Sequence, residues 1–184
     1  MLDIRMSARM QDHMERMKRA IENADLMVLV GYPSGLTHIE TTHHINPESG
    51  ERTTGTQAGG DLAELAEKLH FGTAEIPSRP FLEDGLNLNQ EELRKALKKE
   101  LEKLKETGKA NLDKVGTMAV GKVQELVRSG YYKDKVPNAP LTIKLKGSDT
   151  PLIDGANMID SLRYVKVING KPGEPHKIPQ RGGA

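Results

Sequence analysis

Two prolines within one short stretch constrain the fold of this chain more than any other feature. Residues 71–82 contain both phenylalanines of the protein, Phe71 and Phe81, and also Pro77 and Pro80. A proline fixes φ, removes a hydrogen-bond donor and pushes the residue before it into an extended conformation. We therefore predict a stiff, extended connector between two helices, which we call the clamp segment. Phe81 and Leu82 are expected to anchor it in the core.

The composition limits the size of the core and the class of protein. Aromatic residues make up 3% of the 184 residues, and there are eight methionines and no tryptophan. We expect either a small aliphatic core or one that other subunits complete. The 27 basic and 26 acidic residues nearly balance, which argues against a dedicated nucleic-acid-binding protein.

Cysteine usage and hydropathy bear on the compartment. The chain contains no cysteine, which excludes disulfides and thiolate sites and fits synthesis in a reducing cytoplasm. No apolar run reaches the roughly 18 residues that a membrane-spanning helix needs, and the first residues lack the pattern of a signal peptide. We expect a soluble protein that is used without export.

The first 32 residues predict a helix followed by a strand. Apolar side chains recur at helical spacing before residue 24, at Met6, Met10, Met14, Met17 and Ile21. This narrow stripe predicts an amphipathic helix that packs on the core, with a partner-binding face as the alternative. Residues 26–32 form a short apolar run punctuated by glycine and followed by proline, which favours a strand.

Residues 34–60 are rich in threonine, serine, glycine and histidine and have no clear periodicity. We interpret them as a long loop that is flexible or ordered by a partner, with an extended hairpin as the alternative. His38, His43 and His44 lie in this segment, but their spacing matches no zinc motif. Solvated histidines are therefore favoured over a metal site.

The rest of the chain predicts further helices and strands. Helical spacing is found in three segments, residues 61–70, 89–104 and 115–127, of which the second is long and highly charged. Alternation predicts a half-buried strand at residues 141–145, and residues 164–168 form a last apolar strand. Residues 169–184, with four glycines and three prolines, are predicted to be a flexible tail.

No phosphate loop, dinucleotide fingerprint or nucleophile motif is present, so the sequence gives no reason to expect an enzyme. Asp154 and Asp160 could pair for metal or acid–base chemistry, and a metal-dependent hydrolase would combine them with the loop histidines. We favour ordinary structural roles for both. A nucleic-acid-associated module would use a basic cluster, Lys95, Lys98, Lys99 and Lys103, but the glutamates among them favour a solvated helix face.

The order of several short segments resembles the tail-completion and neck proteins of tailed bacteriophages, the family that includes the lambda-like minor tail protein Z. The first group of matching residues lies in the clamp segment and comprises Phe71, Gly72, Thr73, Ile76, Pro77, Arg79, Pro80, Phe81 and Leu82. The second group lies downstream and comprises Asn138, Lys146, Gly147, Pro151, Leu152 and Asp154. Relative to the family, residues 34–60 read as an insertion.

The resemblance implies an α+β fold in which a small, mostly antiparallel sheet is packed by an N-terminal helix and the long charged helix. Residues 1–168 would form a single domain. The resemblance also implies a structural protein of the virion neck, assembled in the bacterial cytoplasm without cofactor, metal or covalent chemistry. Such proteins form homo-oligomeric rings, commonly hexamers, between the head–tail connector or head-closure proteins and the tail terminator or tube proteins. Neither a membrane nor a specific nucleic acid is expected as a partner.

Within this interpretation, the clamp segment fixes the long helix against the sheet. Arg79 lies between Ser78 and Pro80 among apolar neighbours. We expect its side chain to pair with an acidic group of the same subunit, with a contact across a ring interface as the alternative.

Overall fold

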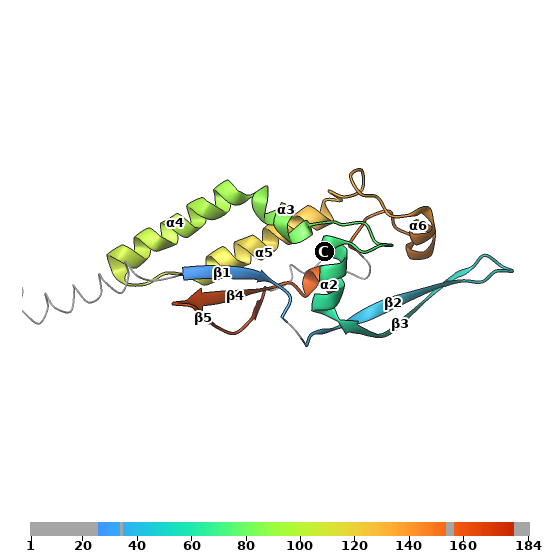
Figure 1. The fold of residues 1–184 in the computed structure, drawn as a ribbon, viewed down its shortest axis with the longest axis horizontal. Coiled ribbons are helices and arrows are strands. Elements are labelled where there is room, and N and C mark those ends of the chain that lie inside the picture. Colours follow the sequence, from blue (N-terminus) through green and yellow to red (C-terminus); the bar gives the residue numbers. More distant parts are fainter. Residues whose placement is uncertain (1–25, 34, 154–156, 179–184) are drawn as a thin grey trace, which may run out of the picture.

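The computed structural model describes residues 26–33, 35–153 and 157–178, and it has an α+β fold (Figure 1). The predicted N-terminal helix lies outside the described residues, as do Asp154 and the last six residues. Two antiparallel sheets are present in the described part, and helices lie along one side of the larger sheet. The expected fold class is therefore confirmed.

The larger sheet is built on the two apolar runs that predicted strands. β1 (Leu26–Gly31) pairs antiparallel with β4 (Arg163–Ile168) along its whole length, so residues 132 to 142 positions apart in sequence lie side by side. The other edge of β4 pairs with two short strands, β5 (Lys171–Pro172) and β6 (His176–Lys177). The sheet therefore joins the beginning and the end of the described chain.

The predicted flexible tail at 169–184 is wrong for residues 171–178. Two kinds of contact order this segment. The free edge of β4 supplies backbone hydrogen bonds, and side chains of the segment pack against apolar or aromatic residues. The ring of His176 stacks on Tyr164 with centroids 5.1 Å apart. Ile178 is buried in the core. The glycine and proline content predicted flexibility, because composition gives no information on pairing with another strand.

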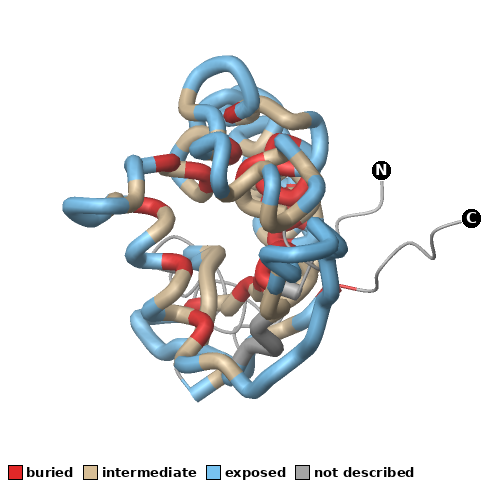
Figure 2. The backbone as a smooth tube through the Cα atoms, turned by 90° about the vertical axis from the view of Figure 1, so that its right-hand side faces the viewer, coloured by how far each residue is buried: buried red, intermediate tan, exposed pale blue. Residues whose placement is uncertain are grey.

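One helix, α5 (Leu112–Arg128), supplies much of the core. Its apolar residues recur at helical spacing, and the buried ones include Val115, Ala119, Val120, Val123 and Val127. This stripe packs on β1 and β4 and also contacts α3 (Phe81–Asn87). In Figure 2 the buried segments lie toward the interior of the molecule, with exposed backbone around them.

The long charged helix is confirmed as α4 (Gln90–Thr107), which begins after Asn89 and ends at Gly108 in the left-handed region (φ 70°). Glycine takes this conformation without the steric cost of a Cβ atom. α4 packs against α5, and α5 in turn packs on the sheet. α4 therefore forms an outer layer on α5, and the expectation that it packs on the sheet is wrong. This outer position explains why its sequence is so polar.

Residues 37–61 form the extended hairpin that was the alternative to a loop. β2 (Thr37–Ile45) pairs with β3 (Arg52–Asp61), and the ribbon projects from the body of the protein (Figure 1). At its tip, the Asn46 side chain accepts hydrogen bonds from the amides of Glu48 and Ser49. Threonine-rich strands lacking a buried face give little hydrophobic periodicity, so the preferred prediction of a loop was wrong.

The predicted strand at 141–145 is also wrong: this segment lies within a helix, α6 (Pro140–Lys146). Pro140 occupies the first turn, where its missing N–H costs nothing, and Gly147 ends the helix with φ 70°. Leu141, one of the residues that produced the alternating pattern, is 66% exposed. Two short elements complete the helices of the described residues, α2 (Leu62–Phe71) and α7 (Asn157–Asp160).

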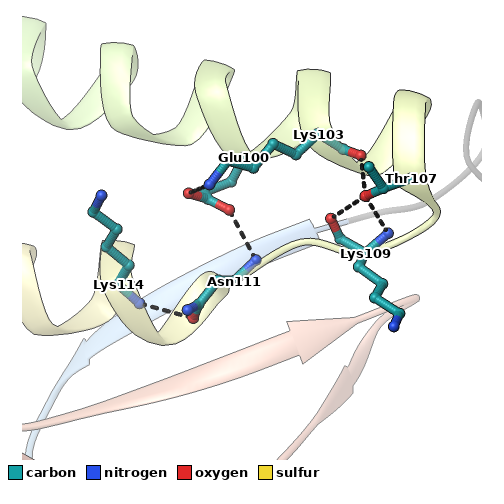
Figure 3. Close-up of polar contacts among 6 residues, drawn as sticks. All are labelled: Glu100, Lys103, Thr107, Lys109, Asn111 and Lys114. Carbon is teal, nitrogen blue, oxygen red and sulfur yellow. Dashed lines mark hydrogen bonds and ion pairs between the residues drawn. The ribbon is translucent and has the colours of Figure 1, made fainter.

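A buried carboxylate connects the end of α4 to the start of α5 (Figure 3). Only 2% of Glu100 is exposed, and its side chain accepts hydrogen bonds from Lys103 Nζ and the Asn111 amide, both at 3.0 Å. The hydrogen bond from Lys103 is the largest cause of a lowered pKa of Glu100, followed by that from the Asn111 amide. The Asn111 side chain in turn caps α5 by accepting from the Lys114 amide.

Gly116 is predicted to be essential for the packing of α5 on the sheet. A Cβ atom at this position would overlap the buried ring of Tyr164, so Gly116→Ala should lower the free energy of unfolding by about 1–3 kcal/mol. The matched control is Gly121→Ala in the same helix, where nothing lies within 4 Å of the added atom. It should be neutral or stabilising by up to about 1 kcal/mol. Urea unfolding checks both, and equal effects of the two changes would contradict this packing.

Glu100→Gln is predicted to destabilise the protein in a pH-dependent way. The pKa of Glu100 is lower in the folded protein than in the unfolded chain, so its contribution is complete above the ordinary pKa of glutamate. That contribution is lost as the pH falls through the lowered value. The free energy of unfolding should therefore differ most between wild type and variant at pH 7, and less below about pH 4. The exposed neighbour Glu102 provides the control: Glu102→Gln should show no such difference.

Candidate interaction site around the clamp segment

The clamp segment begins at the end of α2, a helix with a cap at each end. At its start, the Asp61 carboxylate accepts hydrogen bonds from the amides of Ala63 (2.8 Å) and Gly35 (2.9 Å). The bond from Gly35 is the largest cause of a lowered pKa of Asp61. At its end, Gly72 has φ 80°, as expected for a glycine that ends a helix. The clamp segment therefore begins at a fixed position, the capped end of α2.

The clamp segment folds back on α2, so the prediction of an extended connector is wrong in its first half. Thr73 closes a turn: its amide donates to Ile76 O, and its hydroxyl accepts from the Glu75 and Ile76 amides. The Ser78 hydroxyl then donates to His70 O at 2.7 Å. A Cβ atom on Gly72 would lie 2.7 Å from the Ser78 amide nitrogen, so only glycine permits this close approach.

The two phenylalanines have different environments. Phe81 is fully buried, and its ring makes edge-on contacts with His70 (5.6 Å) and Tyr32 (6.5 Å). Phe71, in contrast, is 72% exposed. Leu82 is half-buried at the start of α3. The anchor is thus Phe81, and Phe71 presents an aromatic ring to solvent.

Arg79 joins the clamp segment to a distant part of the chain. Its guanidinium donates to the main-chain oxygens of Val136 (2.9 Å) and Pro137 (3.0 Å) and lies 3.5 Å from Asn138 Oδ1. The side chain is 5% exposed. The expected acidic partner is wrong, because the acceptors are neutral oxygens, but the expected contact within the subunit is confirmed. A planar guanidinium can hold two carbonyls at once, which a single ammonium does less well.

Only part of the second group of residues that carry the resemblance lies near the clamp segment. Asn138 contacts Arg79, and its amide also donates to Asp149 O. Lys146 donates to Thr150 O at 3.2 Å, and Gly147 ends α6. Both residues lie farther along the chain than the residues that Arg79 contacts. Pro151 is fully buried and Leu152 has a positive φ of 63°. Asp154 lies outside the described residues.

A groove of about 470 Å³ lies between the end of β1, α2 and α3. Its residues are mostly apolar or aromatic: Tyr32, Ala63, Ala66, His70, Phe71, Leu82 and Leu86, with Glu67 and Glu83 as the acidic members. Tyr32 Oη and His70 Nδ1 are buried without a hydrogen-bond partner within the described part of the chain. Burial raises the pKa of Tyr32, so its hydroxyl stays protonated.

Sequence reasoning did not identify this groove. Tyr32, His70 and Phe71 line it, and the buried ring of Phe81 contacts both Tyr32 and His70. The clustering of Phe71 and Phe81 was visible in the sequence, but the contribution of Tyr32 depends on the tertiary structure. The groove is therefore an apolar, aromatic surface with an acidic edge, suited to contact with another polypeptide.

The alternative sites do not come together in the described residues. His43 and His44 are neighbours on β2, so their side chains point to opposite faces of the hairpin. Nothing is described of the side chain of His38. Asp160 forms an ion pair with Arg128 of α5, while Asp154 is not described. Within the described ranges, no group of three or more histidine or acidic side chains is arranged to hold a metal ion.

The basic residues of α4 are interleaved with acidic ones. Lys103 pairs with Glu100 at 3.0 Å, and Glu92 pairs with Lys122 of α5 at 2.8 Å. Three lysines are exposed on the surface of the helix: Lys98, Lys99 and, one turn earlier, Lys95. Several charges of α4 are thus used to hold it on α5 or within its own last turns.

Comparisons with known proteins returned no relatives. Neither a scan against protein-family models nor searches of curated proteins and of solved structures gave a match to this chain. Among the described helices, none combines the length and apolar character needed to cross a membrane.

Arg79→Met is predicted to loosen the clamp segment. Methionine keeps the length of the side chain but leaves the oxygens of Val136 and Pro137 without their donor. Hydrogen bonds from charged groups contribute about 1.5–3 kcal/mol each, so we expect a loss of roughly 2–4 kcal/mol in the free energy of unfolding. Arg94→Met, at an exposed position of α4, is the control and should change it little. Denaturant titration measures both, and an unaltered Arg79→Met midpoint would contradict this role.

Proposed function

We propose that this chain is a structural protein of the neck of a tailed bacteriophage, a ring-forming tail-completion protein that joins the tail to the head connector during assembly. The observation that carries the proposal is the set of hydrogen bonds that Arg79 donates. It links the clamp segment to residues 136–138, so two regions that independently carry the resemblance touch in space. Their matching residues would then act as a scaffold, with no covalent chemistry required.

The β2–β3 hairpin supports an assembly role. Eight of the ten residues of β3 are exposed, and the ribbon projects beyond the helices (Figure 1). A two-stranded ribbon has marginal stability alone and offers unpaired backbone groups along its edges. In a ring, each subunit uses two different surfaces, one on each neighbour. The hairpin is suited to be one of these surfaces.

The proposed partners follow from this role. Six copies of the chain would form a ring in the virion neck. One face of the ring would contact connector or head-closure proteins, and the other would contact tail terminator or tube proteins. Assembly would take place in the cytoplasm of the host bacterium.

The direct test is genetic complementation in the phage that encodes this chain. Disrupting the gene should yield separate filled heads and tails, or joined particles with faulty necks, when lysates are examined by electron microscopy. Supplying the intact gene in the host should restore infectious particles. Normal infectious particles without the gene would refute the proposal.

A variant of the hairpin should separate assembly from folding. Thr54→Lys combined with Thr56→Lys places two charges on exposed positions of one face of β3. The thermal midpoint of the isolated protein should stay within a few degrees of wild type, while complementation should fall by at least tenfold. The control, Asn87→Lys with Gln90→Lys, adds the same charge at exposed positions outside the hairpin and should complement normally. Full complementation by the hairpin variant would exclude the hairpin from the assembly contacts.

A further inference from the structure

We propose that the groove between α2 and α3 binds the N-terminal segment, residues 5–21, of a neighbouring copy of this chain. This inference rests on the proposed ring and adds the identity of one of its contacts. The argument uses the surface of the groove, its charges, the pattern of the segment and the direction in which the chain enters the sheet.

The groove has the features of a polypeptide-binding surface. Its floor is formed by small and apolar side chains, including Ala63, Ala66 and Leu86, and Phe71 stands at its edge with 72% of its surface exposed. A large exposed aromatic ring beside an apolar depression is typical of the residues that dominate binding energy at interfaces. In a chain with only two phenylalanines, leaving one in water requires a reason, and a bound partner supplies it.

The polar groups of the groove select a cationic partner. Glu67 on α2 and Glu83 on α3 are both exposed members of the lining, one on each helix. The buried atoms Tyr32 Oη and His70 Nδ1 lack hydrogen-bond partners among the described residues. Both atoms have almost no exposed surface, so the preference of the groove for positive charge rests on the two glutamates. The groove therefore fits an apolar stripe flanked by positive charge.

The N-terminal segment has this pattern. Its stripe of methionines and an isoleucine (Met6, Met10, Met14, Met17, Ile21) is accompanied by five basic residues, Arg5, Arg9, Arg16, Lys18 and Arg19, against two acidic ones, Asp12 and Glu15. At about 100° per residue, Arg9 falls on one side of the stripe and Lys18 on the other. Two flanking cations can then face Glu67 and Glu83 on the two walls. Methionine side chains adapt to irregular apolar surfaces, which suits a shallow groove.

Chain direction favours a neighbouring copy as the donor. β1 runs toward α2, so the chain enters the sheet at the end of β1 that lies away from the groove (Figure 1). To fill its own groove, the segment would have to reverse direction and run back along the full strand. A segment that continues outward instead reaches the next subunit, and repetition of this contact closes a ring.

Cysteine cross-linking tests the contact directly, because the chain has no cysteine of its own. Full-length chains carrying Met14→Cys are mixed with chains carrying Leu86→Cys and oxidised at a concentration at which light scattering detects association. We expect disulfide-linked dimers containing one chain of each kind, and a ladder of higher multimers when both changes are in one chain. Replacing Leu86→Cys by Glu125→Cys, on an exposed side chain of α5, should abolish the cross-link.

Two outcomes would overturn the inference. One is efficient cross-linking within single chains carrying both cysteines while the mixed single variants fail to link, which would show that the segment binds its own groove. The other is normal ring assembly without any Met14–Leu86 cross-link, which would refute this contact but leave the proposed neck function intact. If disruption of the gene leaves infectious particles normal, the proposed function itself fails.

Charge exchange gives an independent readout. Glu67→Lys with Glu83→Lys should weaken association at least tenfold, whereas Glu102→Lys with Glu106→Lys, at exposed positions of α4, should not. Adding Arg9→Glu and Lys18→Glu to the groove variant should restore much of the affinity, since opposite charges face each other again. No effect of the groove variant, or no rescue by the exchange, would count against the proposed pairing.

Discussion

Packing of α5 on the β1–β4 pair is the interaction on which the rest of the structure depends. The chain has few large rings, so its core must come from aliphatic side chains that one helix presents along a continuous stripe. Gly116 lets the helix approach Tyr164 closely, and Gly85 of α3 faces Val123 in the same way. α3, α4 and α7 all pack against this helix. A small core of this kind leaves several surfaces of the chain uncovered.

The clamp segment converts that core into a defined surface. Phe81 is fixed in the core, Arg79 binds the carbonyls that follow the end of α5, and Ser78 closes on the last turn of α2. These contacts hold α2 and α3 as the two walls of one groove. The same segment leaves Phe71 in solvent at the edge of that groove. Structural rigidity and an exposed aromatic ring thus come from adjacent residues.

A protein with these properties is suited to assembly. Its described part has a projecting ribbon, an apolar groove with an acidic edge and a polar outer helix. The proposed neck role uses the first two as contact surfaces between copies or with neighbouring proteins. The residues of the clamp segment would then act by positioning these surfaces, because a ring closes only if every copy holds them at the same angle.

Local chemistry by itself determined much of the fold: Asp61 and Gly72 mark the ends of α2, Gly108 ends α4, and the apolar runs give β1 and β4. Tertiary structure alone decided the rest. Residues 171–178 depend on pairing with β4, and the helix at 140–146 receives a hydrogen bond from Arg52 of β3 at its end. The hairpin depends on the pairing of two largely exposed strands. Periodicity and composition give no information on such pairings. The neutral partners of Arg79 and the meeting of Tyr32 with α2 and α3 have the same origin. Both require contacts between residues dozens of positions apart, and only the folded chain brings these together.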